Sequence, residues 1–163
     1  MAPLQVVANT SPLIYLAVLD QFLLLKELFA QVHIPAAVYQ ELVIQGVGQP
    51  GADETRIAVD MGWIQQVVVQ NRTAVDALLG ELDLGEAEAI VLARELNIKQ
   101  VLLDDRAART KAKLMGLTPS GTIGVLLLAR KAGVEIDLKH DLDVLIQHNF
   151  RLSRDLYDTL VAT

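Results

Sequence analysis

The sequence predicts an α/β fold in which helices cover both faces of a parallel sheet. The main observation is alternation, because short β-forming apolar segments are separated by longer segments with helical periodicity. The second observation is the segment 4–8, an apolar run with Val6 and Val7 at its centre that indicates a buried strand. The third is size, because 163 residues suit one domain and can bury a core without covalent staples.

The elements of the first half follow from strand-forming runs and helix start signals. The segment from Asn9 to Pro12 combines cap residues with a proline that tolerates a first helical turn. The segment 46–51 is rich in glycine and predicts a loop. In order, we expect a strand at 4–8, helices ending near Leu19 and Phe29, a strand at 32–34, a helix from Pro35 to about Ile44, and a short helix before a strand at 63–69.

The second half continues the alternation. The segment 82–96 is strongly helical and is entered through Asp83 or Gly85, and Gly116 is a typical stop signal. We expect helices at 82–96, 106–115 and 120–131, a strand at 99–103, and two further helices towards the C-terminus. We interpret the chain as a single domain over 1–163, with 135–163 as a C-terminal helical extension.

Composition excludes several classes of function. No apolar run reaches the roughly 18 residues of a membrane helix, and no secretion signal is present, so we expect a cytoplasmic protein without a membrane partner. The absence of cysteine excludes disulfides and thiol catalysis, and the scattered histidines disfavour a zinc site. A net charge of −6 argues against a general nucleic-acid coat. It does not exclude a nuclease, because an acidic site can bind cations and a local basic rim can still hold RNA.

Two glutamates lie on predicted apolar helix faces. At about 100° per residue, Glu86 aligns with Ala89 and Ile90, whereas Glu88 projects to the other side and is expected to be solvated. Glu41 shows the same pattern as Glu86 against the apolar neighbours of its own helix. A carboxylate that faces a core is costly unless it is paired, protonated or bound to a cation. Helix capping by Glu86, and pairing of Glu41 with a lysine or arginine, are the alternatives.

Polar side chains also follow two predicted strands. Asn9 comes directly after the first strand, and Asp104 and Asp105 come after the strand at 99–103. Ligands of open α/β sheets bind beyond the carboxyl ends of the strands. Oxygen ligands suit Mg²⁺ or a similar hard cation, and one or two such metals activate water for displacement at phosphorus. Helix capping is the alternative for Asp105 and Asn9, and the nearby hydroxyl of Ser11 is equally ambiguous.

A basic face follows the aspartate doublet. Arg106, Arg109 and Lys113 share one face of the helix predicted at 106–115, where they can contact phosphates. The alternative is a solvated basic face. The start of the next helix, at Ser120 to Thr122, is a second candidate site for binding phosphate.

Four segments carry a resemblance to a known family. They are Val6 to Ile14, Ile34 to Leu42, Leu84 to Ile90, and Leu103 to Arg109. In this order they resemble the PIN superfamily, and in particular a prokaryotic group similar to VapC-type toxins. The resemblance runs from Val6 to Val161. It implies a three-layer fold with a central parallel sheet of four to five strands. It also implies a Mg²⁺- or Mn²⁺-dependent endoribonuclease, often a homodimer, and an antitoxin partner for toxin members.

By position, the resemblance assigns the second and third family acids to Glu41 and Glu86, and the fourth to Asp104 or Asp105. Asn9 stands where the family usually has its first aspartate, although the VapC-like group often has asparagine here. An amide oxygen still ligates a metal but brings no negative charge. We therefore keep a second hypothesis, a catalytically silent module that binds RNA or protein. Phosphotransfer on small molecules is disfavoured, because it needs a nucleophilic aspartate where Asn9 stands.

Overall fold

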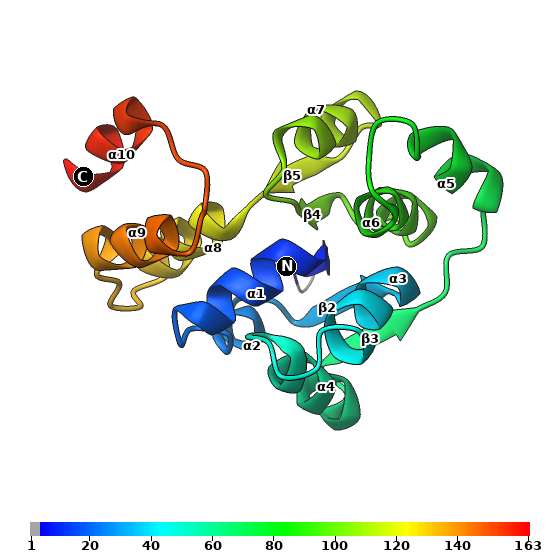
Figure 1. The fold of residues 1–163 in the computed structure, drawn as a ribbon, viewed down its shortest axis with the longest axis horizontal. Coiled ribbons are helices and arrows are strands. Elements are labelled where there is room, and N and C mark those ends of the chain that lie inside the picture. Colours follow the sequence, from blue (N-terminus) through cyan, green and yellow to red (C-terminus); the bar gives the residue numbers. More distant parts are fainter. Residues whose placement is uncertain (1–3) are drawn as a thin grey trace.

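The computed structural model describes residues 4–163. Its strands are β1 (Gln5–Ala8), β2 (Gln31–Pro35), β3 (Ile64–Val67), β4 (Gln100–Leu102) and β5 (Thr118–Ser120). They form a parallel sheet with the order β3-β2-β1-β4-β5 (Figure 1). The predicted α/β fold, with a parallel sheet of four to five strands, is confirmed.

Helices connect the strands and flank the sheet (Figure 1). In chain order they are α1 (Thr10–Val18), α2 (Leu24–Leu28), α3 (Ala36–Tyr39), the π-helix η1 (Gln40–Ile44), α4 (Ala52–Met61), α5 (Arg72–Leu78), α6 (Leu84–Glu95), α7 (Arg106–Leu114), α8 (Thr122–Lys131), α9 (Leu138–Gln147) and α10 (Arg154–Val161). Within residues 4–163, none of these helices has both the length and the apolar character that crossing a membrane requires.

Side chains alternate across β1, and this alternation divides the core into two layers. Val6 and Ala8 pack in one hydrophobic cluster with residues of α1, α2 and α8. Val7 packs in the other cluster, against residues of α5, α6 and α7. Both faces of the sheet are therefore covered, which leaves the carboxyl ends of the strands as the place where a ligand can reach it.

The carboxyl ends of β1, β4 and β5 lie side by side. The N–H of Asn9 donates a hydrogen bond to the carbonyl of Leu102 at 3.0 Å, and the N–H of Leu103 donates to the carbonyl of Ser120 at 2.7 Å. The polar residues that follow β1 and β4, including Asp104, are thus brought to the same edge of the sheet.

The alternation in the sequence does not predict α5 or β5. Ser120 was expected to begin a helix, but it ends β5, and α8 begins only at Thr122. Pro119 makes β5 hard to predict from the sequence, because proline is depleted in strands. It is tolerated here because β5 lies at the edge of the sheet. The start of α5 does have a sequence signal, since the side chain of Asn71 caps it by accepting from the N–H of Ala74 at 3.0 Å.

Candidate functional site

Asn9 lies at the carboxyl end of the central strand β1 and is 5% exposed. It precedes α1, but its side chain makes no capping hydrogen bond, so the interpretation of Asn9 as a simple helix cap is wrong. Its buried Oδ1 has no hydrogen-bond partner within residues 4–163. A buried polar atom left in this state costs about 1–3 kcal/mol. A ligand that reaches this atom would therefore find an acceptor already free.

Glu41 lies in the first turn of the π-helix η1. Of the apolar residues predicted to share its face, Val38 is buried and lies with Glu41 around Gly85, whereas Glu41 itself and Ile44 are exposed. The π-turn, whose hydrogen bond joins Gln40 and Gln45, breaks the step of about 100° per residue on the side of Ile44. The carboxylate of Glu41 accepts a hydrogen bond from the hydroxyl of Thr10 at 3.0 Å, in place of the expected lysine or arginine.

Gly85 brings Asn9 and Glu41 together at the start of α6. A Cβ atom on Gly85 would lie 3.0 Å from Oδ1 of Asn9 and 3.1 Å from Oε2 of Glu41. The missing side chain therefore leaves a small space bordered by an unpartnered amide oxygen and a carboxylate oxygen. Hard divalent cations bind oxygen donors of this kind, so these residues fit such a cation.

Glu86 follows Gly85 and is 8% exposed, in agreement with its predicted position on the apolar face. Its Oε1 accepts from the N–H of Asp83 at 3.0 Å, and its own N–H donates to Oδ1 of Asp83 at 2.8 Å, which forms a capping box. The capping alternative is therefore present. Burial raises the pKa of Glu86 to about 7, and the charges of Asp83 and Asp105 make smaller contributions in the same direction.

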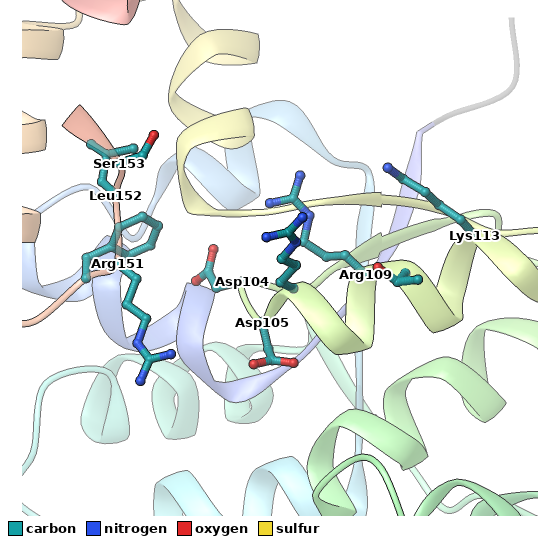
Figure 2. A pocket seen from close by; sticks show the side chains of 10 residues that line it. Asp104, Asp105, Arg109, Lys113, Arg151, Leu152 and Ser153 are labelled. Atoms are coloured by element: carbon teal, nitrogen blue, oxygen red, sulfur yellow. The ribbon is translucent and has the colours of Figure 1, made fainter. Parts of the chain in front are cut away.

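The carboxylates of Asp104 and Asp105 point in different directions (Figure 2). The N–H and the hydroxyl of Thr122 both donate hydrogen bonds to Asp104, each at 2.7 Å. This approach requires Gly121, where a Cβ atom would lie 2.5 Å from Oδ1 of Asp104. Burial raises the pKa of Asp104, although the Thr122 bonds oppose the effect. The start of α8 was predicted as a phosphate-binding site. That prediction is wrong, because Asp104 already fills the position.

Asp105 caps α7, as one of the alternatives predicted. Its Oδ2 accepts a hydrogen bond from the N–H of Ala108 at 3.0 Å, and the residue is exposed. The charge of Asp105 contributes to the raised pKa of Glu86. The charge of Asp104 instead contributes to the raised pKa of Tyr15, for which burial is the larger cause. Asp105 is therefore the member of the doublet that faces Glu86.

The predicted acids border one edge of the sheet but do not converge on one point. Within the described part of the chain, no three histidine, aspartate or glutamate side chains are close enough together to hold a metal ion. The reason is that local hydrogen bonds engage the carboxylates, as with Asp83 at Glu86 and Thr122 at Asp104. Gathering them around a cation requires side-chain rotation.

A cleft of about 1010 Å³ opens beside Asp104 and Asp105 (Figure 2). Its opposite wall is the segment 150–153, which links α9 to α10 and brings Arg151 into the cleft. The basic residues of α7 that were predicted as phosphate contacts all line it: Arg106, Arg109 and Lys113. Ser11, the hydroxyl noted beside Asn9 in the sequence and considered as a further RNA contact, lies half-buried in the first turn of α1 and is not part of this lining.

The cations of this cleft form no ion pairs within the described residues, although the charge of Arg109 opposes the raised pKa of Asp104, which also lines the cleft. None of the ion pairs within residues 4–163 involves the cleft residues of α7 or Arg151. In a chain with a net charge of −6, four unpaired cations on one cleft concentrate positive potential there. Sequence reasoning missed Arg151, because no spacing rule connects it to a helix that ends nearly forty residues earlier.

Glu88 is the clearest error of the sequence prediction. It was expected to be solvated, but it is buried, with only 5% of its surface exposed. Its Oε2 pairs with Arg72 at 2.7 Å, and its Oε1 accepts from the N–H of Ala37 at 3.0 Å. The side chain therefore connects α6 to α5 and to the start of α3, which leads into Glu41. Since α5 was not predicted, the helix that covers Glu88 was absent from the sequence analysis.

A sequence comparison with curated proteins gives no match. A sequence model described as PIN domain matches residues 5–163, nearly the whole chain. PIN domains are typically nucleases, and PIN nucleases generally use divalent metals, which agrees with oxygen donors at the carboxyl edge of a parallel sheet. The chain belongs to the PIN-domain family.

Proposed function

We propose that this chain is a metal-dependent endoribonuclease that hydrolyses phosphodiester bonds of RNA. One observation carries the proposal: the unpartnered, buried Oδ1 of Asn9 lies across the space at Gly85 from the carboxylate of Glu41. An apolar or hydrogen-bonded residue would be expected at a purely structural position. An oxygen donor held without a partner beside a carboxylate instead favours a site for a hard cation.

Four side chains would hold Mg²⁺ or Mn²⁺. Asn9 and Glu41 would do so directly from their present positions, and Glu86 and Asp105 would approach from the starts of α6 and α7. The bound metal would supply a Lewis acid that makes a water nucleophilic. Ser11 would help to orient that water. Asp104 was an equal candidate in the sequence, and its two bonds to the start of α8 favour a role in fixing the loop that carries Asp105.

The cleft beside the acids would hold the RNA backbone. Arg106, Arg109, Lys113 and Arg151 can neutralise phosphates without reading sequence, and since they form no ion pairs within residues 4–163, none has to break first. Because they line the cleft next to Asp104 and Asp105, a bound strand would pass close to the metal site.

The proposal is tested by measuring Mn²⁺ binding by calorimetry and RNA cleavage on the same samples. The variants are Glu86→Gln and the control Glu54→Gln, because Glu54 occupies the same third position of a helix and accepts from the N–H of Gly51 at 3.3 Å. We expect cleavage to be abolished in Glu86→Gln and unchanged in the control, with both proteins folded. Metal-dependent cleavage at the wild-type level in Glu86→Gln would refute the assignment.

A second candidate is a catalytically silent module that binds RNA or protein. It is favoured by the absence, within residues 4–163, of three acids close enough to hold a metal, and by the uncharged side chain of Asn9. The two candidates differ in turnover. Retention of RNA without cleavage over a range of Mn²⁺ concentrations supports the silent module.

The resemblance to VapC-type toxins motivates the finer parts of the proposal. We propose a cytoplasmic RNA-cleaving toxin that pairs with an antitoxin and forms a homodimer. We also propose that residues 135–163 are a helical extension of one domain over 1–163. Light scattering tests the dimer. Relief of growth arrest by a gene adjacent to that of the protein tests the antitoxin.

A further inference from the structure

Another hollow, of about 370 Å³, is lined in part by Glu41. Small-molecule sites in proteins commonly measure about 300–1,000 Å³, so one planar ring system fits a hollow of this size. It shares Glu41 and Gly85 with the proposed metal site, so a group bound here would lie next to the scissile phosphate. The side chains that form its rim are Gln40, Gln45 and Leu84.

The π-helix explains why two amides face this hollow. The N–H of Gln45 donates to the carbonyl of Gln40 at 2.9 Å, which is the i to i+5 bond of a π-turn. The two residues are therefore one turn apart, whereas in an α-helix five residues would place them on different faces. Both are exposed, and their hydrogen bonds within the described residues are those of the backbone.

The chemistry of this hollow differs from that of the basic cleft. None of the residues that line it is a lysine or arginine, and Glu41 and Asp83 would repel a phosphate. Amide side chains carry both donors and acceptors, which match the edge of a nucleobase. Leu84 is 45% exposed and offers an apolar surface against which a ring can stack. The hollow therefore suits a neutral, planar, hydrogen-bonding group.

We propose that this hollow binds an unpaired nucleobase of the RNA strand, and that Gln40 and Gln45 select which base is accepted. The inference rests on the proposed function, since it places the base next to the phosphate that is cut. A base can reach the hollow only when it is free of pairing. The substrate is accordingly single-stranded at this nucleotide, with its phosphates in the basic cleft and this one base in the hollow.

The test is a binding measurement that does not need catalysis. Fluorescence anisotropy is measured for short single-stranded oligoribonucleotides that differ at one base, with Gln40→Ala and Gln45→Ala in the Glu86→Gln background. The control is Gln147→Ala, an exposed glutamine at the end of α9. With both glutamines present, the protein should bind one base about 5- to 100-fold more tightly than the others, which is the range expected for a specific pair of base contacts. Each alanine variant should lower that preference several-fold, without changing affinity for an abasic oligomer.

The outcomes separate the inference from the proposed function. A base preference that survives in both alanine variants, or that is absent from the parent protein, overturns the inference whether or not RNA is cleaved. A preference that is lost in both variants supports it, even if no metal concentration gives cleavage. In that case the proposed nuclease activity fails, and the hollow remains a base-binding site of an RNA-binding module.

Discussion

Replacing Glu86 by glutamine should make the protein more stable at neutral pH while removing its nuclease activity. Glutamine is accepted at the third position of a capping box, so the hydrogen bond from the N–H of Asp83 at 3.0 Å can be kept. What is lost is a negative charge that is buried and lies near Asp83 and Asp105. Removing an unfavourable charge and keeping its hydrogen bond is a stabilising change.

The magnitude follows from the pKa of Glu86, which burial raises from 4.5 to about 7. Because the folded state holds this proton more tightly than the unfolded state, the contribution of Glu86 to stability is fully present below pH 4.5 and is lost as the pH rises to about 7. Each pKa unit corresponds to about 1.4 kcal/mol, which sets an upper bound of about 3.5 kcal/mol. The carboxyl group retains some contact with water, so we expect about 1–2 kcal/mol.

The assay is urea unfolding at pH 5 and at pH 8, in the presence of a chelator. Glu86→Gln should exceed the wild type by about 1–2 kcal/mol at pH 8, and by only about a quarter of that difference at pH 5. The control Glu54→Gln has the same helix position and a similar bond, to the N–H of Gly51. A stability difference between Glu86→Gln and the wild type that is the same at both pH values, or that is larger at pH 5, would refute the reasoning.

Three further substitutions test other parts of the structure. Gly85→Ala places a Cβ atom 3.0 Å from Oδ1 of Asn9, so calorimetry should show at least about tenfold weaker Mn²⁺ binding with an unchanged melting temperature; unchanged affinity contradicts the proposed location of the metal. Arg151→Ala should weaken binding to all RNA sequences alike and reduce the salt slope measured by anisotropy by about one, whereas no change excludes it from the cleft contacts. Glu88→Ala leaves the N–H of Ala37 unpaired, and urea unfolding should show a loss of about 2 kcal/mol; a loss below about 0.5 kcal/mol contradicts a structural role.

Residues whose position depends on the chain near them were well predicted. The apolar run around Val6 and Val7 gives the central strand, and β1 places Asn9 at its carboxyl end. Glu86 faces the core because α6 is a regular helix over the whole stretch that the periodicity covers. The basic face of α7 is likewise regular, so its residues line one cleft.

Residues whose position depends on irregular or distant structure were not well predicted. The π-turn in η1 breaks the α-helical step between Gln40 and Gln45, so periodicity places Glu41 correctly with Val38 but wrongly with Ile44. Burial of Glu88 depends on Arg72, which lies on a helix that the alternation does not indicate. Arg151 reaches the cleft only because α9 and α10 pack beyond the sheet. Periodicity within one segment contains no information about such long-range neighbours.

The central place of β1 has a consequence for the order in which the protein is made. Among the five strands of the sheet, β1 is made before its neighbour β2, and its partner on the other side, β4, begins only at Gln100. Pairing across such a separation is slow and cannot precede synthesis of the later half. Asn9 and Glu41 are therefore translated long before Asp105 and Arg151. A growing chain would hold an incomplete site, and any nuclease activity would begin only after Arg151 has been made.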